Sequence, residues 1–312
     1  DFAPSADPDK SPSRGGDGRL TSAAYLRSAP HGGEGGHRAL TLEYHHPLEK
    51  WLGRRIVRRL LAMLAADGPD GMTALERILA SYRNPAAPRR QRLKYWPIHR
   101  LIDRLRGKVD AETFRRRLVE HAPTLRGLVV VARSLAEFGL TTPQRFVAPL
   151  FAVWNFTNRC NLACQHCYQD AGRSAGDAEL TLDEKLDLID QMGRAHMPMV
   201  AFSGGEPTLS DDLLPVLRRA RRYGMHATLA TNGTTMTEDL AARLAEAGLR
   251  YVEISLDSVD PARHDGFRGV SGMWQRAVRG ARIVVATPPL RLGIAMCVHQ
   301  GNFAEVRDMI AF

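Results

Sequence analysis

The second half of the chain alternates short apolar runs with amphipathic stretches. The apolar runs have the length of buried strands, and they cover residues 150–156, 199–202, 227–230, 251–256 and 292–298. Helix signals fall between them. Thr181 and Asn302 each stand three residues before a glutamate, Ser210 and Thr237 each precede two acidic residues, and Gly248 stands where a helix should end. Repeated strand–helix units predict a parallel sheet, either open or curled into a barrel.

A helical pattern fills residues 39–148. Apolar residues recur every fourth position from Leu52 to Leu64, and a second stripe follows Pro123 and ends at Gly139. Proline and glycine clusters near residues 69 and 85, and the single Pro97, divide the segment into several short helices. Residues 1–38 are rich in Gly, Pro and Ser, so we expect a disordered leader there.

Charge is distributed unevenly along these segments. The whole chain has 43 Lys and Arg against 34 Asp and Glu, and residues 38–148 hold 22 of the basic residues but only 10 of the acidic ones. A basic helical face can be merely solvated, or it can bind an acidic protein or a nucleic acid. We do not expect a nucleic-acid partner, because no aromatic residues are interleaved and no known binding motif accompanies the arginines.

Cysteine use and hydropathy indicate the compartment. The chain has four cysteines, too few for a disulfide scaffold, and three of them lie within eight residues. The longest apolar stretch, residues 125–138, is interrupted by charges and is too short to cross a membrane. We therefore expect a cytoplasmic protein without a membrane partner.

The clustered cysteines are Cys160, Cys164 and Cys167, directly after the first predicted strand. Three thiolates on a short loop can bind three irons of a four-iron cluster and leave the fourth iron open to a small molecule. Two alternatives remain: a zinc site completed by His166 or Cys297, and cysteines that bind no metal. Cys297, on the fifth predicted strand, is expected to be a small buried apolar residue.

Polar residues follow the other predicted strands. The loop after the second strand has two glycines, which let the backbone approach a ligand, and a glutamate, which can accept hydrogen bonds from an ammonium group. Because loops at the carboxyl ends of parallel strands form the site in such folds, these residues should meet there. The residues are Gly204, Gly205, Glu206 and Pro207 after the second strand, Thr231 and Asn232 after the third, and Ser255 and Asp257 at the fourth. Exposed turns, a helix cap or a salt bridge are the alternatives for them.

The cysteine loop followed by Gly-Gly-Glu-Pro resembles the radical S-adenosylmethionine (SAM) superfamily over residues 149–312. The resemblance implies a partial parallel βα barrel, a [4Fe-4S] cluster on Cys160, Cys164 and Cys167, and SAM chelated by the open iron. It assigns SAM contacts to Gly204, Gly205, Glu206, Pro207, Thr231, Asn232, Ser255 and Asp257, and places the backbone of His166 near the adenine. It leaves the catalytic residues unknown.

The activity implied by this resemblance is reductive cleavage of SAM to methionine and a 5'-deoxyadenosyl radical, which abstracts hydrogen from a substrate. The resemblance therefore implies an oxidoreductase or maturase of unknown substrate. A low-potential donor such as a ferredoxin or flavodoxin would supply the electron, and its docking surface could be the basic segment, including Arg115–Arg117. The helical segment that precedes the strands and the Cys-x-His-Cys-Tyr run resemble the peptide- and cofactor-maturing (SPASM-like) relatives. The family core usually has six strand–helix units and only five are visible, so we expect a C-terminally incomplete sequence. A non-catalytic iron–sulfur or zinc protein is the second hypothesis.

Overall fold

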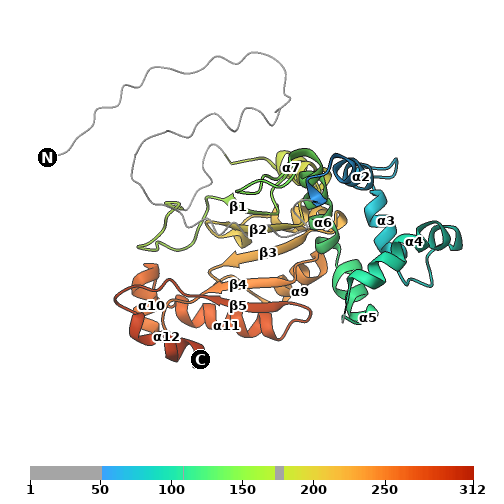
Figure 1. The fold of residues 1–312 in the computed structure, drawn as a ribbon. Coiled ribbons are helices and arrows are strands. Elements are labelled where there is room, and N and C mark those ends of the chain that lie inside the picture. The colour runs from blue at the N-terminus through green and yellow to red at the C-terminus, as the bar shows by residue number, and fades with distance from the viewer. Residues whose placement is uncertain (1–50, 108, 173–178) are drawn as a thin grey trace, which may run out of the picture. The chain divides into compact units, whose positions relative to one another are not determined.

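The computed structural model describes residues 51–107, 109–172 and 179–312, and all of these belong to one compact unit (Figure 1). The leader expected at residues 1–38 lies outside the described residues, as does the beginning of the helical segment. The described residues before 148 are helical and the strands follow it, but both parts lie in the same compact unit, so the domain boundary expected near residue 148 stays a prediction. None of the described helices is long and apolar enough to cross a membrane.

The described strands form one parallel sheet in the order β1-β2-β3-β4-β5, which confirms the predicted parallel βα architecture (Figure 1). Each strand lies close to its predicted run: β1 (Phe151–Thr157), β2 (Met199–Gly204), β3 (His226–Thr231), β4 (Tyr251–Ser255) and β5 (Arg291–Ala295). The intervening elements are α7 (Leu182–Arg194), the 3-10 turn η2 (Pro207–Leu209), α8 (Leu213–Arg222), α9 (Glu238–Ala247), α10 (Pro261–Arg268) and α11 (Met273–Val285). After β5 come the 3-10 turn η3 (Phe303–Glu305) and α12 (Val306–Ala311).

The main core lies between the sheet and its helices. Alternate strand residues such as Phe202, Leu229 and Ile254 are fully buried against apolar helix residues such as Leu217 and Leu244. Residues on the other face of the strands, such as Ala201 and Ser203, are smaller or polar. This alternation follows from the two-residue period of a strand and leaves the second face free to line a cavity.

Two of the four predicted caps are confirmed. Thr181 forms a capping box with Glu184, and Thr237 accepts a hydrogen bond from the backbone N–H of Leu240. Gly248 ends α9 in the left-handed conformation, as predicted.

The other two caps are wrong. Helix α8 begins two residues later than the Ser210 signal implies, because a turn from Pro207 precedes it. Asn302 makes no side-chain cap; instead its amide donates to the carbonyls of Asp257 and Cys297.

The middle segment is helical, as expected. Its elements are α2 (Arg55–Ala65), α3 (Ala74–Ser81), α4 (Arg89–Leu105), α5 (Ala111–Phe114), the π-helical turn η1 (Arg115–Val119) and α6 (Ala122–Phe138). The predicted break at Pro97 is wrong, because Pro97 lies inside α4. Only one backbone N–H is lost at a proline, and residues on both sides of it anchor the helix: Tyr95 is buried, and His99 hydrogen-bonds Ser81.

The apolar stripe expected on the first helix does not form its core. Ile56 is 79% exposed and Leu60 51% exposed in α2. A smaller face is buried instead, where Ala65 packs against Val129 and Ala132 of α6. The short side chains let α2 and α6 approach closely. The four-residue spacing therefore predicted the helix correctly, but it did not predict which face of the helix is buried.

Arg126 joins α6 to the amino edge of the sheet. Its side chain is buried, with 7% exposure, and its guanidinium donates to three backbone carbonyls: Met197 O at 3.0 Å, Tyr223 O at 2.8 Å and Gly193 O at 2.7 Å. Burial lowers the pKa of Arg126 to about 10, so the group stays charged at neutral pH. One charged side chain thus satisfies three carbonyls that precede β2 and β3 or lie near the end of α7.

We expect Arg126→Met to lower the free energy of unfolding by about 3 kcal/mol, because three buried carbonyls lose a charged donor. Urea unfolding followed by circular dichroism measures the change. Arg90→Met, at an exposed position of α4, is the matched control and should change stability by less than about 0.5 kcal/mol. Equal unfolding midpoints for the two variants would show that Arg126 is not an anchor.

Candidate functional site

A cavity of about 360 Å³ opens at the carboxyl edge of the sheet. Its walls come from the cysteine loop after β1 and from the ends of all four other strands. The lining residues predicted from sequence are Cys160, Cys164, Cys167, His166, Gly204, Gly205, Thr231, Asn232 and Ser255. Five separate segments therefore converge on one cavity, as the parallel topology requires.

Three predicted residues do not line this cavity. Glu206 and Asp257 are fully buried behind its wall, and Pro207 is buried in η2. Their side chains contact other protein groups, which gives them a supporting position rather than a place on the cavity surface.

The cysteine loop is closed at its base and held at its middle. Gly172 N–H donates to Asn158 O, and Cys160 N–H donates to Gly172 O at 2.6 Å, which joins the two ends of the loop. The backbone N–H groups of Ala163 and Gln165 donate to the carbonyls of Arg268 and Phe267, at 3.1 and 3.0 Å. The loop therefore binds the carboxyl end of α10, whose last carbonyls have no partner within the helix.

Each cysteine of the loop accepts one N–H hydrogen bond at its sulfur. Leu162 N–H donates to Cys160 Sγ at 3.4 Å, and Ala171 N–H donates to Cys167 Sγ at 3.4 Å. Arg268 Nη1 donates to Cys164 Sγ at 3.7 Å. All three thiols are free. Such donors stabilise thiolate, the form of cysteine that binds metal.

Burial raises the pKa of the Cys160 and Cys164 thiols. For Cys164 the nearby Arg268 opposes this effect. A cation beside a thiolate offsets the desolvation of its charge, so the site is best suited to sulfur that is bound to metal.

The donor set fits a four-iron cluster. Three thiols lie on one short loop, each with an N–H donor at its sulfur, and each cysteine of such a cluster binds its own iron. Among the described residues, no three His, Cys, Asp or Glu side chains are placed so that they could share one metal ion. His166 Nδ1 is also buried beside the cavity without a hydrogen-bond partner in the described part of the chain, which leaves it available to a ligand.

Gly204 and Gly205 bring two loops together. A Cβ at Gly204 would lie 2.6 Å from Thr157 O, and one at Gly205 would lie 2.2 Å from Arg159 O. The absence of side chains thus lets the glycine turn pack on the backbone that leads into Cys160. The close approach to a ligand that the sequence predicts for these glycines stays a prediction; the structure shows a close approach to the cysteine loop.

Glu206 ties together the ends of β2 and β3. Its carboxylate accepts hydrogen bonds from Thr231 Oγ1 at 2.7 Å, from Asn232 N at 2.7 Å and from both N and Oγ1 of Thr208. Burial raises the pKa of Glu206, and these donors act in the opposite direction. Asn232 in turn donates to Asn161 of the cysteine loop at 2.8 Å.

Asp257 anchors the far side of the cavity. It is 1% exposed; its Oδ2 accepts from Arg268 Nε at 2.5 Å, and its Oδ1 accepts from Cys297 N at 2.9 Å. The salt-bridge alternative for Asp257 is therefore present. Arg268 lines the cavity, but no sequence motif identifies it before the fold is known.

The expectation for Cys297 is wrong. Cys297 is exposed and lines the cavity, because β5 ends at Ala295 and the chain then turns so that Cys297 N–H reaches Asp257. The predicted strand, residues 292–298, was three residues too long at this end. A fourth thiol therefore faces the same cavity as the cysteine loop.

Three rings stack beside the cysteine loop. Phe267 lies between His166, at a centroid distance of 4.1 Å, and His299, at 4.4 Å. Sequence reasoning singled out His166 but missed the phenylalanine on which it stacks. The stack holds one face of the His166 ring against Phe267 of α10.

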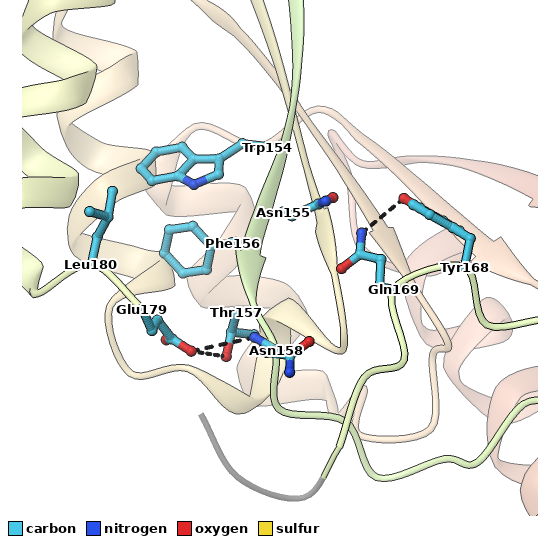
Figure 2. Close-up of a pocket in the computed structure, with 9 residues that line it drawn as sticks. All are labelled: Trp154, Asn155, Phe156, Thr157, Asn158, Tyr168, Gln169, Glu179 and Leu180. Carbon is cyan, nitrogen blue, oxygen red and sulfur yellow. Dashed lines mark hydrogen bonds between the residues drawn. The ribbon is translucent and has the colours of Figure 1, made fainter. Parts of the chain in front are cut away.

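A second cavity, of about 490 Å³, lies along β1 (Figure 2). Figure 2 shows Trp154, Phe156 and Leu180 on one side of the strand and Asn155 with Gln169 on the other. Gln169 Nε2 donates to Tyr168 Oη at 2.9 Å, and these two residues line both cavities.

Glu179 supports the end of β1 in this second cavity. It accepts from Thr157 Oγ1 at 2.8 Å and pairs with the buried Lys185, whose ammonium lies 4.5 Å from the Phe156 ring centroid. Glu179 and Lys185 thus fix the last residues of β1, after which the cysteine loop begins.

A parallel βα sheet with a three-cysteine loop at its carboxyl edge is the arrangement expected of a SAM-dependent iron–sulfur protein. The Radical SAM superfamily model matches residues 154–312, and the chain belongs to this family of enzymes. Fe-coproporphyrin III synthase of Methanosarcina barkeri is 38% identical over 154 residues, covering 49% of this chain and 38% of the relative. Pre-heme d1 synthase of Dinoroseobacter shibae is 35% identical and mycofactocin maturase MftC of Mycobacterium tuberculosis 31% identical, covering 51% and 52% of this chain and 39% and 41% of those proteins.

Solved structures agree on the fold. Streptococcus suis SuiB bound to S-adenosylmethionine has a TM-score of 0.53 at 15% identity and covers 77% of this chain and 53% of its own. The aligned 77% of this chain is more than the family match over residues 154–312, so the structural likeness also includes part of the helical segment before the sheet. The chain spans about two fifths of the curated relatives it matches. Synthases and maturases are a broader group than the oxidoreductases expected from sequence.

We expect Gly269→Ala to reduce cluster loading, because the added Cβ would lie 2.3 Å from Ala163 O and push the cysteine loop off α10. Iron per chain after anaerobic reconstitution, with the thermal midpoint, measures the effect. Gly272→Ala is a matched control: it has a similar positive φ (+80° against +74°) but nothing within 4 Å of the added Cβ. Equal iron content in the two variants would mean that the loop contact is not needed.

Proposed function

We propose that this chain carries the catalytic core of a radical SAM enzyme, in which Cys160, Cys164 and Cys167 hold a [4Fe-4S] cluster. The observation that supports it most is the cavity at the carboxyl edge. It contains all three thiols, each with an N–H donor at its sulfur, and the glycine turn of the second motif. Three cysteines leave one iron without a protein ligand, so SAM can bind there.

When bound, the cluster and SAM supply the radical chemistry: one-electron cleavage of SAM yields the 5'-deoxyadenosyl radical that abstracts hydrogen from the substrate. The residues of this chain bind and orient. We assign the methionine end of SAM to the ends of β2 and β3, through Gly204, Gly205 and Asn232, with Glu206 and Pro207 behind them. Ser255 at the end of β4 is assigned to the ribose, Asp257 to its support, and the backbone near His166 to the adenine.

The substrate we propose is a peptide or a cofactor precursor. Relatives include enzymes named as heme-pathway synthases and as the maturase MftC, and SuiB has been solved with its precursor peptide SuiA. The inner face of the sheet below the SAM cavity has small or polar residues such as Ala201, Ser203 and Thr228, which leaves room for a substrate beside the cluster.

An electron donor of low potential, ferredoxin- or flavodoxin-like, is part of this proposal. The Arg115–Arg117 cluster is a weaker candidate for its docking surface than the sequence implied. Arg115 pairs with Glu112 and Glu120, and the helical segment meets the sheet at the amino edge, opposite the cysteines. We therefore propose the donor without assigning its surface.

We expect Cys160→Ala, Cys164→Ala and Cys167→Ala each to lose the cluster, because two thiolates do not hold a four-iron cube. Iron and sulfide analysis after anaerobic reconstitution, with EPR of the reduced protein, measures this. Cys297→Ala is the control inside the same cavity and should keep four irons per chain. If Cys297→Ala lost iron as completely as the others, Cys297 would be the fourth ligand, and the non-catalytic hypothesis would replace ours.

Glu206→Gln should weaken SAM binding to the loaded protein by about ten- to a hundredfold, because an amide cannot accept all the hydrogen bonds from Thr208, Thr231 and Asn232 that fix the ends of β2 and β3 beside the SAM site. Calorimetry measures the affinity, and an unchanged visible spectrum shows that the cluster remains. Gln keeps the shape of the buried side chain better than Ala. Glu238→Gln, at an exposed position in the first turn of α9, is the control. Unaltered affinity would leave Glu206 a purely structural role.

A further inference from the structure

Arg268 differs from the other two donors to the cysteine sulfurs. Cys160 and Cys167 receive backbone N–H groups, which no substitution except proline removes. Cys164 receives a guanidinium N–H, from Arg268 Nη1. The sulfur of Cys164 is thus the one of these three whose hydrogen bond depends on a side chain, and this donor also brings a positive charge.

The guanidinium is held rigidly. Arg268 is 8% exposed, and Asp257, 1% exposed, accepts from its Nε at 2.5 Å. A guanidinium stays protonated in proteins, and the carboxylate of Asp257 pairs with its charge. Asp257 is itself fixed by Cys297 N–H and by the backbone N–H that it donates to His264 Nδ1.

The backbone of the same residue positions the loop that it faces. Arg268 O accepts from Ala163 N, next to Cys164, and α10 ends there at Gly269. Movement of Cys164 relative to the guanidinium is therefore restricted from both sides. A donor that is fixed before the cluster binds needs no reorganisation when the charge on the sulfur changes.

The charge of this group favours the reduced cluster. A [4Fe-4S] cluster gains one negative charge when an external reductant donates one electron and it passes from the 2+ to the 1+ state. Hydrogen bonds to the sulfurs and nearby charges set the potential of such clusters, and their effect is larger where water is excluded. A buried cation beside one ligand should make that electron easier to add.

We propose that Arg268 is a positioning residue that donates to the Cys164 ligand of the cluster and, held by Asp257, raises the midpoint potential of the 2+/1+ couple. This inference rests on the proposed function, since it requires the cluster. It adds a second reason for the Asp257–Arg268 pair, beyond holding the wall of the cavity. It also predicts that the cluster can be tuned at one side chain without change to any ligand.

The test is an EPR-monitored redox titration of the reconstituted 312-residue chain without SAM. Arg268→Met removes both the charge and the donor, and the cluster should become about tenfold harder to reduce, a shift of about 59 mV to more negative potential for one electron. Arg268→Lys keeps the charge and should lie closer to the wild-type value. Arg279→Met, at an exposed position of α11, is the control and should not shift.

The outcomes separate this inference from the proposed function. If the wild-type chain holds no four-iron cluster, both are wrong. If Arg268→Met carries four irons and titrates like Arg279→Met, only the inference is overturned, even if SAM affinity falls, because Arg268 would then serve the ligand and not the cluster.

Loss of iron in Arg268→Met moves the test to Arg268→Gln, which is neutral and smaller. Loss in both neutral variants with full loading in Arg268→Lys supports the inference, because the charge then decides whether the cluster is held. Loss in all three, with lowered thermal midpoints, overturns it and leaves Arg268 a role in folding alone.

Discussion

The contact between the cysteine loop and the carboxyl end of α10 is the constraint on which the site depends. The last carbonyls of a helix lack partners within it, and the N–H groups of a loop lack partners within the loop. Here Arg268 O accepts from Ala163 N–H and Phe267 O accepts from Gln165 N–H, so the helix end and the loop satisfy each other's backbone groups. Gly269, left-handed and without a Cβ, allows the approach. Because α10 follows β4, the position of the thiols depends on the whole sheet.

Buried polar bonds extend from this contact around the cavity. Glu206 joins the ends of β2 and β3, and Asn232 reaches the cysteine loop. Asn302 donates to Asp257 O and Cys297 O, which joins the segments after β4 and β5. An unpaired buried polar group is expensive, so such a network permits few alternative arrangements. A site that must place a reactive carbon next to one hydrogen needs that precision.

The two edges of the sheet do different work. At the amino edge, Arg126 satisfies three carbonyls and attaches the basic helices. At the carboxyl edge, cysteines, glycines and small polar residues surround the cavity. Separation of this kind is general in parallel βα folds, where one face carries chemistry and the other stability. It also places most of the basic segment away from the cysteines, so net charge is a poor guide to the site here.

The sequence by itself determined the local features: five strands, the caps at Thr181 and Thr237, the stop at Gly248, and the cysteine and glycine motifs. These depend on neighbours within a few residues, and parallel topology then brings the strand ends together. Only the tertiary structure decided which side chains face the cavity. Glu206 and Asp257 lie behind its wall, Cys297 faces it, and Arg268 reaches Cys164 from 104 positions away. The exposed face of α2 and the continuous α4 through Pro97 were likewise decided by packing. Burial and long-range pairing depend on partners that no local pattern identifies.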